Sequence, residues 1–371
     1  MKFTLDKNAF LKNLQLLSKA IPQRSTLPII SSALFIVKDE ILSMRATDLE
    51  ISINLKSKIE GGEDGCVAIP LGKLLEITSA MPEKNIDFSV SDIGKMNISC
   101  NSGRYTIMGQ PSEEFPSEQV VENSKRLQVS SGELKDMIIN TSYAASKDDL
   151  KPVLQGVLFQ IQNDGIVSVA TDGHRLVKLE KKKLHSIDYI GNIVVPIKFL
   201  ALLTTQLTGD GDISMLIGDN HIQVQLEDVT ITTRIIKDPY PDYEGVIPKN
   251  NTKTLIINKN NFTEAIKRVS IFSNKSSKQV ALELSESSMT ITTEDPENIT
   301  TGKEILDCDY DGEPMTIGYN AFYLKEVLQH QQSEEIKIML NSPLNAGLFL
   351  PIDQNDNDNK TTLLMPIRLN D

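Results

Sequence analysis

The chain has 371 residues, more than one ordinary domain holds, so two or three domains are expected. Hydrophobic residues make up 40% of the chain and charged residues 24%, a balance typical of proteins with packed cores and a hydrated surface. The net charge of −12 argues against a protein that coats nucleic acid through general basicity. Any contact with DNA must therefore be confined to one region of the surface.

Targeting segments and disulfides are not expected in this chain. No apolar run approaches the roughly 18 residues that suggest a membrane span. Asp6 and Lys7 already interrupt the apolar core that a signal peptide needs. The cysteines Cys66, Cys100 and Cys308 lie far apart, without the spacing of a metal site or a disulfide framework. We therefore expect a cytoplasmic protein that contacts no membrane, holds no metal or cofactor, and keeps its cysteines reduced and buried.

At the start of the chain, apolar residues at Phe3, Leu5, Phe10 and Leu14 predict a strand followed by the inner face of a helix. The same four positions are apolar in two later copies, offset by 124 residues (3 to 127) and by a further 128 (127 to 255). These copies read Leu127, Val129, Leu134 and Ile138, and then Leu255, Ile257, Phe262 and Ile266. Such self-similarity indicates a chain built from repeats.

Later elements of the first copy also recur. A turn is predicted after Ala46-Thr47-Asp48, which returns as Ala170-Thr171-Asp172 and more weakly as Thr292-Thr293-Glu294. A second helix is predicted at Pro70 to Ala80, Pro196 to Leu207 and about Asn320 to Gln329, since proline suits a helix start. Period-two alternation after each helix predicts a strand with one buried face. These strands contain Ile86, Phe88 and Val90, then Ile213, Met215 and Ile217, then Ile336, Ile338 and Leu340.

Two proline-rich segments separate the copies, at 110–116 and at 238–243. Each proline fixes its own φ and biases its predecessor toward extended backbone, which suits a stiff linker. We therefore predict an α+β fold of three tandem repeats, each with two helices packed on a mostly antiparallel sheet. The predicted domains are residues 1–117, 125–245 and 250–371.

Motifs for catalysis are sparse. The chain has no glycine-rich phosphate loop, Walker lysine or dinucleotide fingerprint. In Asp172-Gly173-His174-Arg175, His174 could act as a general base oriented by an aspartate, but no serine elbow or metal-ligand cluster accompanies it. The alternative is a tight turn after a strand, with Asp172 capping backbone N–H groups and His174 exposed. Since only the middle copy carries Gly173 to Leu176, we expect a local binding function there.

Four motifs, in order along the whole chain, resemble the bacterial DNA polymerase III β subunit family, the sliding clamps. They are Leu-Pro-Ile at 27–29, Ala-Thr-Asp-Gly-His-Arg-Leu at 170–176, Tyr-Pro-Asp-Tyr at 240–243 and Met-Pro-Ile-Arg-Leu at 365–369. The resemblance implies three DNA-clamp domains per chain, which form half of a closed ring. That ring would be a head-to-tail homodimer around duplex DNA, without sequence specificity and without catalysis of its own. Its partners would be the replicative DNA polymerase, the clamp loader and other proteins with a clamp-binding motif.

The resemblance also implies which residues meet DNA and which close the ring. Asn8, Lys12, Gln15 and Lys19 share one polar face of the first helix, although a solvated helix face is the simpler explanation from the residues alone. The DNA-binding residues expected are Lys12, Lys19, Arg24, Lys73, Lys198, Lys267 and Arg268. Closure would place the edge strand with Arg104, Tyr105 and Ile107 against the region of Ile271 and Phe272, with Arg104 and Glu304 setting the register.

A pocket for partner peptides is implied between the second and third domains, with apolar residues for burial and His174, Arg175 and Asn320 to orient a peptide backbone. The matching positions are Leu154, Thr171, Gly173, His174, Arg175, Leu176, Pro241, Val246, Asn320, Tyr323, Leu344, Leu363, Leu364, Met365, Pro366, Ile367, Arg368 and Leu369. The chain departs from the family at Gly245, where some members have arginine, and at Ser277, where some have an aromatic residue. Asp148, Pro152 and Val153 replace polar or aromatic residues of a DNA-facing loop.

The residues alone are also compatible with two other functions. One is a DNA-modifying or hydrolytic enzyme built on His174, and the other is a repeat-built scaffold with no nucleic acid partner. The scaffold alternative predicts a monomer that never loads onto circular DNA.

Overall fold

A computed structural model describes residues 1–22, 24–82, 84–101, 103–182, 188–209, 211–354 and 357–369. The chain divides into two compact units, which we describe separately. Unit 1 consists mainly of residues 1–132 and 201–235, and unit 2 mainly of residues 133–182, 190–200 and 236–369. Within the described residues, no helix has both the length and the apolar character that a membrane crossing requires. The same part of the chain contains no group of three or more metal-ligating side chains.

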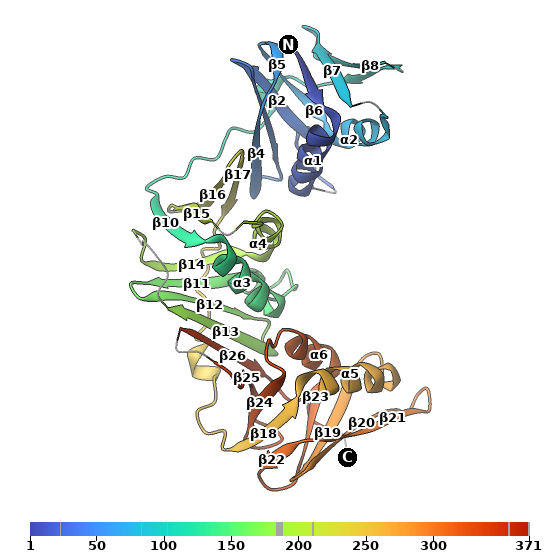
Figure 1. Ribbon diagram of the computed structural model, residues 1–371, viewed down its shortest axis with the longest axis vertical. Helices are drawn as coiled ribbons and strands as arrows, with labels where there is room; N and C mark the ends of the chain where they lie inside the picture. Colours follow the sequence, from blue (N-terminus) through green and yellow to red (C-terminus); the bar gives the residue numbers. More distant parts are fainter. Residues whose placement is uncertain are drawn as a thin grey trace. The chain divides into compact units, whose positions relative to one another are not determined.

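Unit 1 contains two antiparallel sheets (Figure 1). The five-stranded sheet has the order β5-β1-β7-β8-β9, and the eight-stranded sheet has the order β10-β15-β16-β17-β4-β3-β2-β6. The helices are α1 (Lys7–Leu17) and α2 (Leu71–Ala80), with short 3-10 turns η1 (Ser18–Ala20), η2 (Pro28–Ser31) and η3 (Ser112–Glu114). The strands are β1 (Lys2–Asp6), β2 (Ser32–Lys38), β3 (Ile41–Thr47), β4 (Ile51–Lys58), β5 (Glu60–Glu63), β6 (Gly65–Pro70), β7 (Asn85–Val90), β8 (Lys95–Cys100), β9 (Gly103–Met108), β10 (Lys125–Ser130), β15 (Asp212–Ile217), β16 (His221–Leu226) and β17 (Val229–Arg234).

The first strand and helix form where the apolar spacing predicts them. Asp6 ends β1 and caps α1, because its Oδ1 accepts hydrogen bonds from the N–H groups of Asn8 (3.0 Å) and Ala9 (2.9 Å). Phe10 is buried on the inner face of α1, and its ring meets the ring of Phe88 edge-on, with 5.0 Å between the centroids. The opposite face of α1 is left to polar side chains.

Unit 2 also contains two antiparallel sheets. The nine-stranded sheet has the order β14-β11-β12-β13-β26-β25-β24-β18-β22, and the four-stranded sheet the order β21-β20-β19-β23. Helices of this part are α3 (Ser131–Thr141), α5 (Lys259–Val269) and α6 (Ala321–Gln329), with 3-10 turns η4 (Ser142–Ala144), η5 (Pro152–Gln155), η6 (Glu244–Val246) and η7 (Ser270–Phe272). Helix α4 (Ile197–Thr204) is divided between the two units after Leu200. The strands are β11 (Gly156–Gln162), β12 (Gly165–Thr171), β13 (Arg175–Lys182), β14 (Gly191–Pro196), β18 (Lys253–Asn258), β19 (Gln279–Ser285), β20 (Ser288–Asp295), β21 (Thr300–Asp307), β22 (Asp309–Asp311), β23 (Met315–Asn320), β24 (Glu335–Leu340), β25 (Gly347–Pro351) and β26 (Asp358–Leu364).

Both large sheets run across a repeat boundary. In unit 1, β17 of the middle copy pairs with β4 of the first copy, from Val229 opposite Leu55 to Thr233 opposite Ile51. In unit 2, β13 of the middle copy pairs with β26 of the last copy over seven residue pairs, from Arg175 opposite Leu364 to Lys181 opposite Asp358. The middle copy is therefore divided between the two compact units, because β17 extends a sheet of the first copy and β13 extends a sheet of the last copy.

The α+β fold and the repeated strand-helix elements are confirmed. The alternating residues point inward as predicted; Ile86 and Phe88 are both buried, as are Ile336 and Ile338. The second helices are present as α2, α4 and α6, but Pro70 and Pro196 close the preceding strands rather than opening the helices. Helix α4 also ends at Thr204 rather than at Leu207.

The prediction for the cysteines was partly wrong. All three are free, but Cys66 is exposed and Cys100 and Cys308 are only half-buried. Cys66 lies on β6, the outer strand of its sheet, where its thiol reaches the Ser112 hydroxyl at 3.0 Å. An apolar neighbourhood in the sequence does not bury a residue on the outward face of an edge strand.

Both proline-rich linkers pack against a core. Phe115 of the first linker is buried against Ile29, Ile30 and Leu34 in unit 1. In unit 2, Tyr243 of the second linker is buried, and its hydroxyl donates a hydrogen bond to the Gln160 Oε1 at 2.5 Å. Burial and the neighbouring Glu244 carboxylate raise the pKa of the Tyr243 hydroxyl to about 12, so this anchor stays protonated at neutral pH.

Candidate functional site

The turn between β12 and β13 in unit 2 is fixed by its own side chains. The Thr171 hydroxyl donates to the Arg175 carbonyl at 2.6 Å and accepts from the Gly173 N–H at 3.1 Å. Asp172 Oδ1 accepts hydrogen bonds from the N–H groups of His174 (2.9 Å) and Arg175 (3.0 Å). Gly173 has φ +91°, a left-handed conformation that favours glycine. The turn that the sequence predicted as the alternative to a catalytic site is therefore present.

The first copy makes the same turn in unit 1. The Thr47 hydroxyl donates to the Ile51 carbonyl at 2.9 Å, and Asp48 Oδ1 accepts from the N–H groups of Glu50 and Ile51. Leu49, which corresponds to Gly173, has φ 77° and carries the strain of that conformation. Since the backbone turn is shared, what distinguishes the middle copy is the pair of side chains at 174 and 175.

Arg175 is buried, with a relative exposure of 5%, and all three ends of its guanidinium are engaged within unit 2. Its Nε lies 3.1 Å from Asp172 Oδ2, its Nη1 2.6 Å from Glu326 Oε2, and its Nη2 donates to the Tyr143 carbonyl at 2.7 Å. The guanidinium also lies over the rings of Tyr143 and Tyr323, at 5.3 and 4.9 Å from their centroids. Arg175 therefore ties β13 to α6 and η4, and its donors are used by its own chain.

His174 is exposed, and its imidazole stacks on the Tyr323 ring with 5.5 Å between centroids and 19° between planes. Burial raises the pKa of the Tyr323 hydroxyl, and the nearby Asp172 carboxylate raises it further, so this ring stays neutral. The His174 carbonyl accepts a hydrogen bond from the Met365 N–H at 2.9 Å. Farther along, the Ile367 N–H donates to the Gly318 carbonyl at 2.9 Å, so the C-terminal segment runs from the turn to β23.

A cavity of about 340 Å³ opens beside this turn, and we call it the His174 cavity. It is lined by Ala145, Ser146, Lys147, Asp148, Lys151, Asp172, His174, Arg175, Phe322 and Tyr323. Sequence reasoning missed Tyr143, Glu326 and Phe322 at this site. Tyr323 and Glu326 are three residues apart on α6 and so share a face, a spacing that could have indicated their joint role.

The remaining residues of the expected peptide pocket all belong to unit 2 but differ in exposure. Val246, Leu344 and Met365 are exposed large apolar side chains. Leu176 and Leu363, in contrast, are buried in an apolar cluster with Leu158 and Val169. Leu176 is 2% exposed, so a charge placed there would disturb the core and not only a binding cleft.

The other pocket positions are also split by burial. Thr171 and Leu364 are buried; Leu154, Asn320, Tyr323, Pro366, Ile367 and Leu369 are half-buried; Gly173, Pro241 and Arg368 are exposed. Asn320 caps α6, because its Oδ1 accepts from the Phe322 N–H at 2.9 Å, and its Nδ2 donates to the Ser277 carbonyl at 3.4 Å. Like Arg175, it is engaged within the chain and holds the start of α6 in place.

The basic residues expected to meet DNA are all exposed, and all but Arg24 lie on a helix or a 3-10 turn. Lys12 is on α1, Lys19 on η1, Arg24 after η1, Lys73 on α2, Lys198 on α4, and Lys267 and Arg268 on α5. Lys19 donates to the Thr205 hydroxyl at 3.2 Å. Lys73 and Lys267 form exposed pairs with glutamates three residues away, which contribute little to stability.

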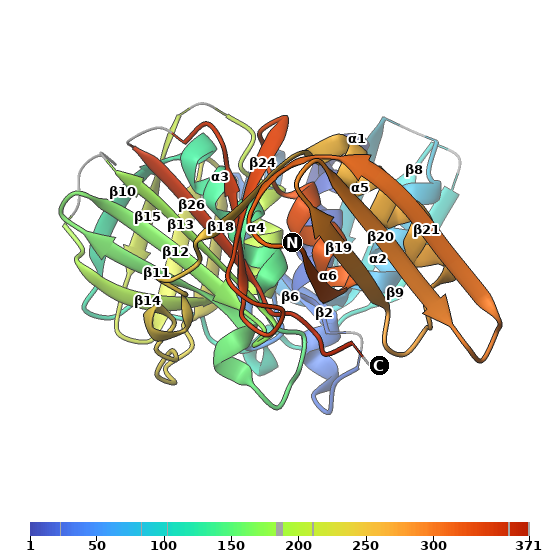
Figure 2. The same cartoon turned by 90° about the horizontal axis from the view of Figure 1, so that it is seen from below.

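The residues expected to close the ring lie on exposed edges. In unit 1, Arg104, Tyr105 and Ile107 are on β9, the outer strand of the five-stranded sheet. In unit 2, β21 is the outer strand of the four-stranded sheet (Figure 2), and Ile271 is 75% exposed beside it on η7. Phe272, also on η7, is 43% exposed.

Glu304 and Arg268 were assigned to different functions from the sequence, but unit 2 brings them together. Arg268 Nε and Nη2 donate to the two carboxylate oxygens of Glu304 at 2.8 and 2.7 Å. This bidentate pair lowers the pKa of the Glu304 carboxyl. Glu304 therefore already has a cationic partner in its own chain, which changes how it can set the register of a ring.

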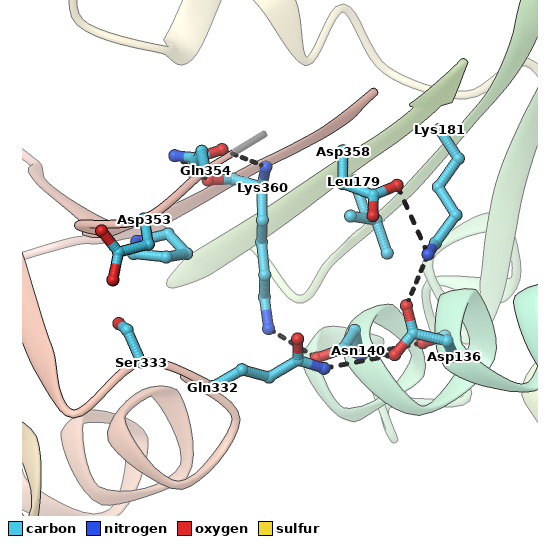
Figure 3. Close-up of a pocket in the computed structure, with 11 residues that line it drawn as sticks. Asp136, Asn140, Leu179, Lys181, Gln332, Ser333, Asp353, Gln354, Asp358 and Lys360 are labelled. Carbon is cyan, nitrogen blue, oxygen red and sulfur yellow. Dashed lines mark hydrogen bonds and ion pairs between the residues drawn. The ribbon is translucent and has the colours of Figure 1, made fainter. Parts of the chain in front are cut away.

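A second cavity of unit 2, of about 280 Å³, contains a buried lysine, and we call it the Lys360 cavity (Figure 3). Lys360 extends from β26 toward helix α3, where its Nζ donates to Asn140 Oδ1 at 2.7 Å and also to the His330 carbonyl. Lys181 lies between Asp136 (2.8 Å) and Asp358 (3.4 Å). Because Lys360 is 6% exposed, burial lowers the pKa of its amine to about 8.

Comparison with known proteins assigns the chain to a family. Three family models match it in order, described as the DNA polymerase III beta subunit N-terminal domain (residues 1–119), central domain (128–242) and C-terminal domain (244–368). The chain belongs to the DNA polymerase III beta subunit family. The resemblance that the four motifs indicated is thus confirmed.

Relatives and solved structures of this family match the chain from end to end. The beta sliding clamp of Pseudomonas aeruginosa is 30% identical and that of Vibrio cholerae 28%, each alignment covering 100% of both chains. A crystal structure of the DNA polymerase III subunit beta from P. aeruginosa matches with a TM-score of 0.92 at 29% identity, again covering 100% of both chains. A P. aeruginosa sliding clamp bound to griselimycin matches equally well, with a TM-score of 0.92, 30% identity and the same coverage.

Proposed function

We propose that this chain is the subunit of a DNA sliding clamp, a homodimeric ring that encircles duplex DNA and holds a replicative polymerase on it. The end-to-end match to the three domains of the beta subunit family carries this proposal. The proposed domains are residues 1–117, 125–245 and 250–371. A closed ring needs only weak contacts, because it cannot leave DNA by simple dissociation, and few fixed phosphate contacts leave it free to slide.

Exposed sheet edges support assembly into a ring. β9 in unit 1 and β21 in unit 2 each leave one side of the backbone without a strand partner in the described chain. Such edges pair readily with another chain, and one open edge in each unit suits head-to-tail contact between two copies. Ile271 and Phe272 supply apolar surface beside β21, while Tyr105 and Met108 supply it on β9. Since Glu304 is held by Arg268, we assign the register mainly to the strands and their apolar side chains.

The basic residues support loose binding to the phosphate backbone without sequence readout. The seven candidates are exposed, and six of them lie on helices or 3-10 turns, in a chain whose net charge is −12. Long basic side chains on helices can follow phosphates without fixed hydrogen bonds to bases. We therefore infer contact with duplex DNA that is sensitive to salt and indifferent to sequence.

We infer that partners bind unit 2 around the His174 turn and the C-terminal segment. Exposed apolar side chains at Val246, Leu344 and Met365 offer surfaces for peptide anchors. Arg175 and Asn320 act as positioning residues, because their polar groups hold the turn and the start of α6. The polymerase, the clamp loader and other proteins with a clamp-binding motif are the proposed partners, and bound partners stay near DNA at high effective concentration.

We infer that the protein lies in the cytoplasm.

We infer no catalytic role for His174. An aspartate that orients a histidine base must accept a hydrogen bond from its ring. Asp172 instead uses Oδ1 for two backbone N–H groups and Oδ2 for Arg175. The His174 ring stacks on Tyr323, which suits a binding surface.

Retention on circular DNA tests the proposed function. The clamp is loaded onto a nicked circular plasmid by a clamp loader, and the DNA-bound fraction is separated by gel filtration before and after one restriction cut. We expect persistent retention on the circle and release after linearisation, while short linear duplexes bind only weakly at low salt. Equal retention before and after the cut would indicate ordinary contact binding and contradict the ring. A protein that never loads would favour the scaffold alternative.

A further inference from the structure

The hairpin tip between β20 and β21 in unit 2 carries an isoleucine in an unusual conformation. Ile299 is 92% exposed, and its φ of 52° lies in the left-handed region. A β-branched residue rarely adopts this conformation, because its Cβ crowds the backbone there. In the single chain, Ile299 therefore combines backbone strain with an uncovered apolar side chain. Such outliers persist only where neighbouring groups enforce them, and they gather at sites where the strain serves a function.

Asp295, the last residue of β20, enforces the shape of the tip. Its side chain is buried, with a relative exposure of 3%. Its Oδ2 accepts a hydrogen bond from Asn298 Nδ2 at 2.7 Å, and its Oδ1 accepts one from the Glu297 N–H at 3.2 Å. The carboxylate thereby ties down the backbone that leads directly into Ile299.

The same carboxylate reaches the connection that follows η7. Asn274 Nδ2 donates to Asp295 Oδ1 at 3.1 Å, while Asn274 Oδ1 accepts from the N–H groups of Ser276 (2.9 Å) and Ser277 (3.2 Å). The side-chain hydrogen bonds from Asn298 and Asn274 lower the pKa of the Asp295 carboxyl from its ordinary value, so it is ionised at neutral pH. One buried carboxylate therefore links the hairpin tip to the connection after η7.

The hairpin tip, η7 and the open edge of β21 lie together. The Thr300 hydroxyl donates to the Phe272 carbonyl at 3.2 Å. A Cβ at Gly302 would lie 3.3 Å from Phe272 Cδ2, so the Phe272 ring packs directly on β21. The exposed Ile271 and Phe272 are thus held beside the same strand that Ile299 precedes.

We propose that Asp295 is a positioning residue for ring closure, which holds Ile299 in its strained conformation so that the side chain packs against Met108 of a second copy. This inference rests on the proposed ring, in which the open edges of β21 and β9 meet. The contact would offset the strain, because it removes apolar surface from water. An isoleucine that destabilises the single chain then stabilises the dimer.

Met108 is the contact that the strand register indicates. Both edge strands pair with their neighbours inside the chain in the antiparallel sense. An antiparallel pairing that sets Glu304 opposite Arg104 also sets Thr300 opposite Met108, one residue from Ile299. Since Met108 is 57% exposed, the two side chains would cover each other at the end of the seam.

Ile299→Gly separates this role from that of an ordinary turn residue. Glycine adopts positive φ without strain, so the free energy of unfolding should stay the same or rise. That is measured by urea unfolding in the monomeric Ile271→Asp/Phe272→Asp background. In the otherwise wild-type chain we expect the dimer dissociation constant to rise roughly tenfold, measured by fluorescence-detected sedimentation velocity. The control Ile190→Gly, at an isoleucine that is 57% exposed outside β9, β21 and η7, should leave that constant unchanged.

Three substitutions test Asp295 in the same assay. Asp295→Ala removes the acceptors and should raise the dissociation constant roughly tenfold, while Asn298→Ala, at an exposed residue, should raise it roughly threefold. Asp295→Asn should keep nearly wild-type dimerisation, because an amide oxygen still accepts and the exposed Asn298 amide is free to turn. In the Ile299→Gly background, Asn298→Ala should cause no further loss, because no side chain remains to be positioned.

The results that would overturn the proposal are distinct from those that would overturn the ring. A dissociation constant for Ile299→Gly within about twofold of wild type refutes the contact and leaves the proposed function intact. Additive effects of Ile299→Gly and Met108→Ala refute Met108 as its partner. Equal losses for Asn298→Ala with and without the Ile299 side chain refute the positioning role. A wild-type chain that is monomeric at micromolar concentration contradicts the proposed function itself.

Discussion

Replacing Lys360 with methionine should change how the stability of unit 2 depends on pH. Lys360 keeps a folded-state pKa of about 8 against an ordinary 10.5, because burial disfavours its charged form. Between these two values the unfolded chain binds more protons than the folded one, so stability rises as pH rises. The charge therefore destabilises the folded state at neutral pH, and this cost disappears as the buried amine loses its proton.

The size of the effect follows from the pKa shift. A difference from 10.5 to about 8, at ~1.36 kcal/mol per unit, corresponds to roughly 3 kcal/mol in total. About 2.5 kcal/mol of it falls between pH 7 and pH 10, since the unfolded lysine is still largely protonated at pH 10. Lys360→Met also leaves Asn140 Oδ1 and the His330 carbonyl without this donor, which costs about 1–3 kcal/mol at every pH.

The assay is urea unfolding of both proteins at several pH values from 7 to 10. The free energy of unfolding of wild-type protein minus that of Lys360→Met should rise by about 2.5 kcal/mol across this range. Asp136, Asp353 and Asp358 line the same cavity and are kept in the variant. Lys249→Met, at an exposed lysine, controls for the loss of one positive charge. A wild-type-minus-variant difference that stays constant from pH 7 to 10 would refute the reasoning.

Three further outcomes are expected. The wild-type protein should be a dimer near twice 41.2 kDa by light scattering. The double variant Ile271→Asp/Phe272→Asp should be monomeric, because both substitutions place a charge in an apolar contact. A wild-type monomer at micromolar concentration would contradict the ring. Arg175→Ala should destabilise unit 2 by about 3–5 kcal/mol in thermal or urea unfolding, since it removes a buried guanidinium and leaves the half-buried carboxylates of Asp172 and Glu326 without it; a change below about 1 kcal/mol would contradict that role. Deleting Met365 to Asp371 should abolish peptide binding in calorimetry and leave the dimer mass unchanged; wild-type affinity in that variant places the pocket elsewhere.

Local patterns in the sequence predicted the local structure well. The spacing of Phe3, Phe10 and their equivalents was sufficient to find the strand-helix starts, because period and burial are properties of short segments. The Thr171-Asp172 turn was also predicted, since a short side chain that caps its own backbone needs no distant partner.

Contacts between distant segments could not be predicted in the same way. No local signal says that β13 pairs with β26, because strand register depends on which edges meet. Arg175 illustrates the consequence at the site, since an arginine in a loop motif suggests an exposed ligand-binding group. Its burial follows only once Glu326, 151 residues away, is brought beside it.

The continuous sheets have a mechanical consequence for any ring that this chain forms. Seven residue pairs join β13 to β26 inside unit 2, and β17 joins β4 inside unit 1, so each joint is a ladder of backbone hydrogen bonds with side chains packed on it. Bending such a joint strains many bonds together, which makes it stiff. A seam between two protomers would lack a covalent connection, and within the described chain β9 and β21 each pair with a neighbouring strand on one side only. A loader that opens the ring would thus act at a seam between protomers rather than at either of these two joints.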